Sequence, residues 1–117
     1  MQYMALIYTD PSKAPAYGTP EFAAYVAGYN TATAAYRKDG AYVAGDALKS
    51  ADTATTVRLR NGKVETMDGP FAESKEQLGG YYIFECADLD AAIRYAAMIP
   101  GAAIGAVEVR PVMSTAM

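Results

Sequence analysis

The chain has 117 residues, a formal net charge of −3, one cysteine and no histidine. This length corresponds to a single domain, residues 1–117, and 52% hydrophobic residues are enough to form a packed core. The negative charge repels phosphate backbones and anionic lipids, so we expect neither a nucleic acid nor a membrane as a partner. Without histidine, a Ser-His or Cys-His relay cannot be built and zinc or haem ligation is disfavoured. The sequence predicts no metal site and no cofactor.

The cellular compartment is predicted from what the composition lacks. Cys86 is the only cysteine, so no intrachain disulfide forms and nothing indicates an oxidising compartment. The N-terminal residues have neither the basic segment nor the long apolar stretch of a signal peptide or membrane span. We therefore expect a cytoplasmic protein, in which Cys86 is a buried small hydrophobic side chain and not a nucleophile.

The first half of the chain predicts a strand, a long helix and a second strand. Gln2 to Tyr8 alternates as a strand, and both of its faces are apolar. Thr19 and Pro20 are typical of a helix start, and Asp39-Gly40 is typical of a helix end. Residues at helical spacing between them form an aromatic stripe, interpreted as core: Phe22, Tyr25, Val26, Tyr29, Thr33 and Tyr36. A short strand is expected at residues 41–45.

The second half predicts a hairpin, a strand, a helix and a final strand. Residues 54–60 and 63–67 alternate as strands around Asn61-Gly62, a strong signal for a tight hairpin turn. The next strand covers residues 79–86, with both faces apolar. A helix capped by Asp88 runs to about Ile99, and the last strand covers residues 104–110. The expected buried side of this helix consists of Leu89, Ala92, Ile93 and Ala96.

This order of elements predicts an α+β, ferredoxin-like sheet with two helices on one face and an inserted β-hairpin. Two helices cover only one face of the sheet. Two of its strands nevertheless carry apolar side chains on both faces, so the second face has to be buried as well. A second copy packed sheet to sheet is the simplest cover. The sequence therefore predicts a homodimer.

Residues 68–82, with the sequence DGPFAESKEQLGGYY, combine a turn, a charge cluster and a strand entry. This segment resembles the signature of the DGPF-type, YCII-related family. Residues 3–8 (YMALIY), 53–58 (TATTVR) and 105–112 (GAVEVRPV) extend the resemblance over nearly the whole chain. The resemblance implies the dimeric α/β-barrel fold. It does not imply a particular reaction.

Two interpretations of the signature segment remain open. In the first, the segment forms a wall of a small-molecule pocket with Asp68, Glu73, Lys75 and Glu76 as its polar groups. Tyr8 and Arg110 are further candidates, from the first and last strands. In the second, the segment is a rigid, ion-paired loop that seals a barrel end, with Phe71 as its hydrophobic anchor. An ion pair between Glu108 and Arg110 is the alternative role for Arg110.

Two hypotheses for the function follow. The first is a small-molecule-binding homodimer, including a cofactor-free enzyme that uses carboxylate and lysine acid–base chemistry. The second is a non-catalytic regulatory or interaction module, because the family resemblance implies a link to extracytoplasmic-function sigma factors. Other YCII-type proteins are associated with a His-Asp pair, and this chain has no histidine to match it. A mechanism based on that pair does not transfer.

Overall fold

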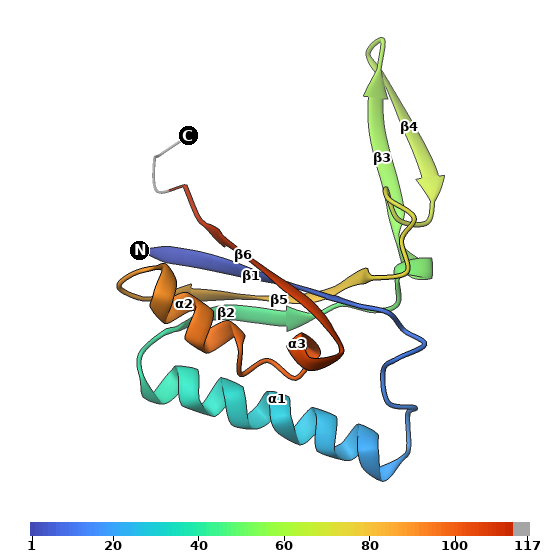
Figure 1. Cartoon of the computed structure of the whole chain (residues 1–117). Coiled ribbons are helices and arrows are strands. Elements are labelled where there is room, and N and C mark those ends of the chain that lie inside the picture. The colour runs from blue at the N-terminus through green and yellow to red at the C-terminus, as the bar shows by residue number, and fades with distance from the viewer. Residues whose placement is uncertain (114–117) are drawn as a thin grey trace.

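The computed structural model of the chain describes residues 1–113 and shows an antiparallel four-stranded sheet with the strand order β2-β5-β1-β6 (Figure 1). The elements in chain order are β1 (Gln2–Thr9), α1 (Pro20–Lys38), β2 (Tyr42–Ala47), a short 3-10 helix η1 (Ala51–Thr53), β3 (Thr55–Arg60), β4 (Lys63–Asp68), β5 (Gln77–Glu85), α2 (Leu89–Ala96), α3 (Gly101–Ile104) and β6 (Gly105–Pro111). The predicted α+β, ferredoxin-like arrangement is confirmed. The predicted second helix is shorter than expected, because Pro100 begins the separate short helix α3.

Local signals in the sequence account for the boundaries of α1 and of the hairpin. The Thr19 hydroxyl accepts a hydrogen bond from the amide of Phe22 at 3.1 Å, which caps α1. Gly40 follows the helix with a φ of +72°. Asn61 and Gly62 both have positive φ, the conformation of the tight turn that joins twisted antiparallel strands. All three predictions are confirmed.

The core lies between the sheet and the helices and is largely aromatic. Tyr36 of α1 packs edge-on against Phe84, with 4.7 Å between the ring centroids. Its buried hydroxyl donates a hydrogen bond to the carbonyl of Tyr95 at 2.7 Å, which satisfies the one polar group of the ring. Ala5 and Ile7 complete the sheet side of this core.

The prediction that the α1 stripe is core is only partly correct. Ala32 and Tyr36 are the buried residues of α1, whereas Val26 is exposed and Tyr25 and Tyr29 are half-buried. Figure 1 shows the reason: the N-terminal half of the long helix diverges from the sheet. Only the C-terminal half lies close enough to the sheet to pack against it.

The predicted buried side of α2 also needs correction. Ala92 and Ala96 are buried, but Leu89 and Ile93 are 47% and 50% exposed. The small alanine side chains form the buried side of the helix. The two larger residues, one turn apart, lie on its partly exposed side. Cys86, just before α2, is half-buried, and burial raises the pKa of its thiol.

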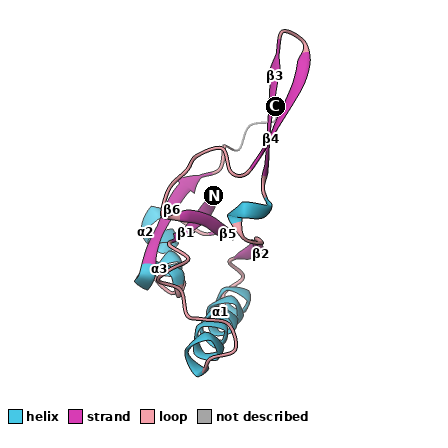
Figure 2. Cartoon of the chain, turned by 90° about the vertical axis from the view of Figure 1, so that its right-hand side faces the viewer, coloured by secondary structure: helices cyan, strands magenta, loops and turns pink. Residues whose placement is uncertain are grey.

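The other face of the sheet is not covered by a helix. The helices lie on one side of the sheet, and the β3–β4 hairpin extends from the opposite side (Figure 1). The view turned by 90° shows the same separation (Figure 2). Met4, Leu6 and Tyr8 alternate with the buried residues of β1 and are only half-buried. We call this surface the open face.

The hairpin makes the single chain unusually extended. The radius of gyration is 16.1 Å, whereas a compact domain of this length has one of about 13 Å. Three apolar side chains of the hairpin, Val57, Leu59 and Val64, are 62%, 64% and 70% exposed. An isolated two-stranded hairpin is marginally stable in water, so the arm needs further contacts to be held in place.

Within residues 1–113, no helix combines the length and the hydropathy needed to cross a bilayer.

Gly80 fits a close approach between β5 and β2, and this generates a first prediction. A Cβ on Gly80 would lie 2.8 Å from the backbone oxygen of Asp46, whereas one on Gly79 would be 3.9 Å from its nearest neighbour, the Thr9 hydroxyl. We expect Gly80→Ala to lower the free energy of unfolding by about 1–3 kcal/mol, because the strands must separate. Urea unfolding of both variants measures this. Equal effects of Gly79→Ala and Gly80→Ala would contradict the account.

Tyr36 generates a prediction on pH. Burial raises the pKa of Tyr36 above the ordinary value of 10, so the unfolded chain releases this proton at lower pH than the folded chain. Its contribution to stability is complete below pH 10 and is lost as the pH rises further. We expect the free energy of unfolding to fall above pH 10 more steeply than in Tyr36→Phe, by up to about 1.4 kcal/mol per pH unit. Tyr17→Phe, at an exposed position, is the control, and an unchanged slope in Tyr36→Phe would refute the prediction.

Candidate functional site

A groove lies where the open face meets the root of the hairpin. Its volume is about 960 Å³. The sheet contributes residues of β1, β5 and β6, and two connections supply the walls: residues 48–54 and the signature segment. The lining residues are Tyr8, Leu48, Lys49, Ser50, Ala51, Thr53, Ala54, Pro70, Phe71, Ala72, Ser74, Glu76, Gln77, Leu78, Ala106, Val107 and Glu108.

Two hydrogen bonds fix the start of the signature segment to the hairpin root. The amide of Gly69 donates to the carbonyl of Ala54, and the Thr56 hydroxyl donates to the carbonyl of Gly69, each at 2.8 Å. Gly69 has a φ of +98°, which a residue with a side chain rarely adopts. This turn directs the chain into the groove wall. It explains why the DGP sequence stands at the end of β4.

Phe71 does not act as the buried anchor expected from the sequence. It lines the groove and is 71% exposed, and the Arg58 guanidinium lies 4.9 Å from its ring centroid. The anchoring role falls to the hydrogen bonds of Gly69. Phe71 therefore offers a free aromatic surface for an apolar ligand.

The groove brings together a few polar groups among apolar walls. Tyr8 contributes a phenol, Lys49 an ammonium group and Glu76 a carboxylate. Glu108 contributes a second carboxylate, which accepts a hydrogen bond from Nε of Arg110. This confirms the expected ion pair. Because Arg110 is exposed, we expect the pair to contribute at most about 1 kcal/mol.

The structure brings together two of the six predicted site residues. Tyr8 and Glu76 line the groove, whereas Asp68, Glu73, Lys75 and Arg110 are exposed and outside its lining. The pKa of Asp10 is lowered mainly by hydrogen bonds from Ser12, with a smaller effect of the Lys75 ammonium, so Lys75 lies near the β1–α1 connection. Among residues 1–113, the ion pairs join Met1 to Glu85 and Glu108 to Arg110. Lys75 is not ion-paired within this part of the chain.

Residues 48–54 form a wall of the groove that was not expected from the sequence. Leu48, Lys49 and Ser50 all line the groove. The amide and the hydroxyl of Thr53 both donate to the carbonyl of Ser50, at 3.0 and 2.7 Å, which closes the 3-10 turn. The adjacent apolar and charged residues Leu48 and Lys49 were the sequence signal that could have indicated a binding wall here.

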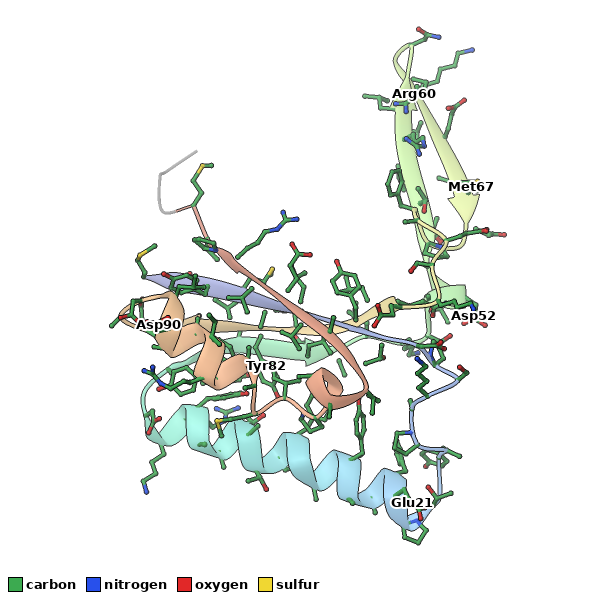
Figure 3. All side chains as sticks on the ribbon, in the orientation of Figure 1. Glu21, Asp52, Arg60, Met67, Tyr82 and Asp90 are labelled. Atoms are coloured by element: carbon green, nitrogen blue, oxygen red, sulfur yellow. The ribbon has the colours of Figure 1, made fainter. Side chains whose placement is uncertain are left out.

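A second cavity of about 450 Å³ lies between the sheet and the diverging half of α1. Four of its hydroxyls lie in two pairs. Those of Tyr25 and Tyr29 lie 3.4 Å apart, and those of Thr33 and Tyr82 lie 2.8 Å apart. Tyr82, labelled in Figure 3, marks the sheet side of this cavity. Burial raises the pKa of Tyr29, so the cavity offers neutral phenols.

One carboxylate reaches the rim of this second cavity. Tyr81 donates a hydrogen bond to Asp46 at 2.9 Å, and this bond raises the pKa of the Tyr81 phenol. The second cavity exists because the aromatic stripe of α1 does not pack fully onto the sheet. Within residues 1–113, no three acidic, cysteine or histidine side chains gather as ligands for a metal ion.

Two comparisons with known proteins cover nearly the whole chain. The YCII-related domain matches residues 1–116. An uncharacterized protein of Rhizobium meliloti (strain 1021) is 35% identical over 113 residues, which are 95% of this chain and 91% of that protein. The family match spans every helix and strand of the structure, from β1 to β6. The chain therefore belongs to the YCII-related family.

Proposed function

We propose that the protein is a homodimer that binds a small molecule in the groove at the hairpin root. The observation that supports this most is the position of the groove. It lies on the sheet face that the helices leave uncovered, where the apolar residues of β1 neighbour the Glu108–Arg110 ion pair, and Tyr8 and Glu76 are among its walls. A second copy stacked on the open face buries that surface and closes the groove from above.

The lining indicates the chemistry of the ligand. Phe71, Leu48 and Leu78 provide apolar contact area, and the charged groups of Lys49 and Glu76 lie on two different walls. A small, largely apolar molecule with one or two polar groups fits this combination. Acid–base catalysis without a cofactor would use the Glu76 carboxylate as the base and the Lys49 ammonium as the acid.

Substitution on the open face tests the dimer. Leu6 points to the open face from the middle of β1, so Leu6→Glu would place a charge in the stacked interface. We expect sedimentation equilibrium to show dimer association weakened by at least about 100-fold, equivalent to about 2.7 kcal/mol. Val26→Glu, an exposed apolar position on α1 on the other side of the sheet, should leave the dimer intact. Equal effects of the two variants would refute this interface.

Ligand-observed NMR with a library of fluorinated fragments tests the groove. We expect fragments that bind the parent protein to lose at least about tenfold in affinity in Phe71→Ala, because the aromatic wall is removed. Those with an amine or a hydroxyl should weaken in Glu76→Gln as well. Lys75→Ala should bind like the parent protein, because Lys75 lies outside the lining.

Thermal unfolding of each variant separates binding from folding. Loss of fragment binding at an unchanged midpoint supports a site, and loss of stability alone supports a structural loop. Binding that depends on Lys75 and not on Glu76 would contradict the assignment. The regulatory-module hypothesis predicts instead a stable heterologous protein partner in cell extract.

A further inference from the structure

The β3–β4 hairpin has two chemically different faces. The register pairs Leu59 with Val64, which places both on one face together with Val57. The opposite face carries charged residues, among them Arg58, which is paired with Glu65. Because the apolar side chains are largely exposed in the single chain, this face lacks a cover within the described part of the protein. The hairpin therefore has the pattern of an arm that packs on another surface.

The length of the arm determines how far it reaches in the proposed dimer. Each hairpin strand has six residues, which span about 20 Å at 3.4 Å per residue. Stacked sheets lie about 10 Å apart. An arm that rises from the open face thus passes the edge of the partner's sheet by about 10 Å. Its tip reaches the layer of helices on the far side of that sheet.

The two ends of the sheet differ, and this decides which partner surface the arm meets. The hairpin rises at one end, and the start of α2 lies at the other, where β1 begins and β6 ends (Figure 1). Arg60 at the hairpin tip and Asp90 at the start of α2 mark these ends in Figure 3. A two-fold axis that runs across the strands, between the stacked sheets, exchanges the ends. An axis along the strands keeps them together and sets hairpin beside hairpin.

Charge distinguishes the two axes. Residues 58–63 of the hairpin contain three cations and no acid. Two such tips side by side repel each other, which disfavours the axis along the strands. The start of α2 carries Asp88 and Asp90, with Arg94 one turn further along. An anionic helix start opposite a cationic tip is the favourable pairing.

The start of α2 also offers the matching apolar surface. Leu89 and Ile93 are four residues apart, so they share one side of the helix, and both are about half exposed. We propose that the hairpin of one copy packs on α2 of the other, with Leu59 and Val64 against Leu89 and Ile93. This contact brings the cationic hairpin tip, with Arg60, close to the anionic start of α2, with Asp90. This inference rests on the proposed homodimer and identifies which surfaces of the two copies meet.

Disulfide cross-linking tests this contact directly. In a Cys86→Ala background, the double variant Leu59→Cys/Ile93→Cys should form a covalent dimer on oxidation, seen on a non-reducing gel. Leu59→Cys/Val26→Cys should not, because Val26 lies on α1. Covalent dimers of the single variant Leu59→Cys would show that the hairpins meet each other, which overturns the inference.

Sedimentation of the same samples tests the homodimer separately from the contact between the hairpin and α2. A non-covalent dimer without a Leu59–Ile93 cross-link refutes the arm contact and leaves the proposed dimer standing. A monomer refutes both. A cross-linked dimer supports both.

Charge reversal supplies an independent measurement. Arg60→Asp and Asp90→Arg should each weaken the dimer about three- to tenfold at low salt, and the double variant should recover most of this loss. Glu21→Lys, at the start of α1, is the control and should have little effect. Additive weakening in the double variant would contradict an attraction between the cationic hairpin tip and the anionic start of α2.

Discussion

The fold depends on a sheet that is covered by helices on one face only, although β1 carries apolar side chains on both. Tyr3, Ala5 and Ile7 of β1 are buried against the helices, and Met4, Leu6 and Tyr8 alternate with them on the open face. Leaving such a surface in water costs roughly 25 cal/mol for each Å² of apolar area that could be buried. The groove and the exposed arm both lie on the side of the sheet that the helices leave uncovered.

The root of the β3–β4 hairpin positions the signature segment beside the sheet. The hairpin stands at one end of the open face. The Gly69 turn and its bonds to Ala54 and Thr56 hold the signature segment at the corner between hairpin and sheet. The segment thereby becomes a wall of the groove, and the DGPF sequence has a structural task as well as a place in the proposed site.

Local sequence signals predicted most of the helices, strands and turns. The burial of individual side chains depended on contacts between segments far apart in the sequence. The Thr19 cap, the Asn61-Gly62 turn and the alternation in β1 act within a few residues, so the sequence shows them directly. The burial of Leu89 or Phe71 depends on how closely a helix or a loop approaches the sheet. The spacing of apolar residues along the sequence carries no information about that distance. The charge pattern likewise identified Glu76 but did not indicate that Lys75 lies near Asp10.

The central claim is that a second copy covers the open face. Small-angle X-ray scattering of the dilute protein tests it most directly, because it reports mass and shape together. The account predicts a particle of twice the 12.4 kDa chain mass whose profile fits two stacked sheets. A particle of one chain mass with a radius of gyration near 16.1 Å would contradict it.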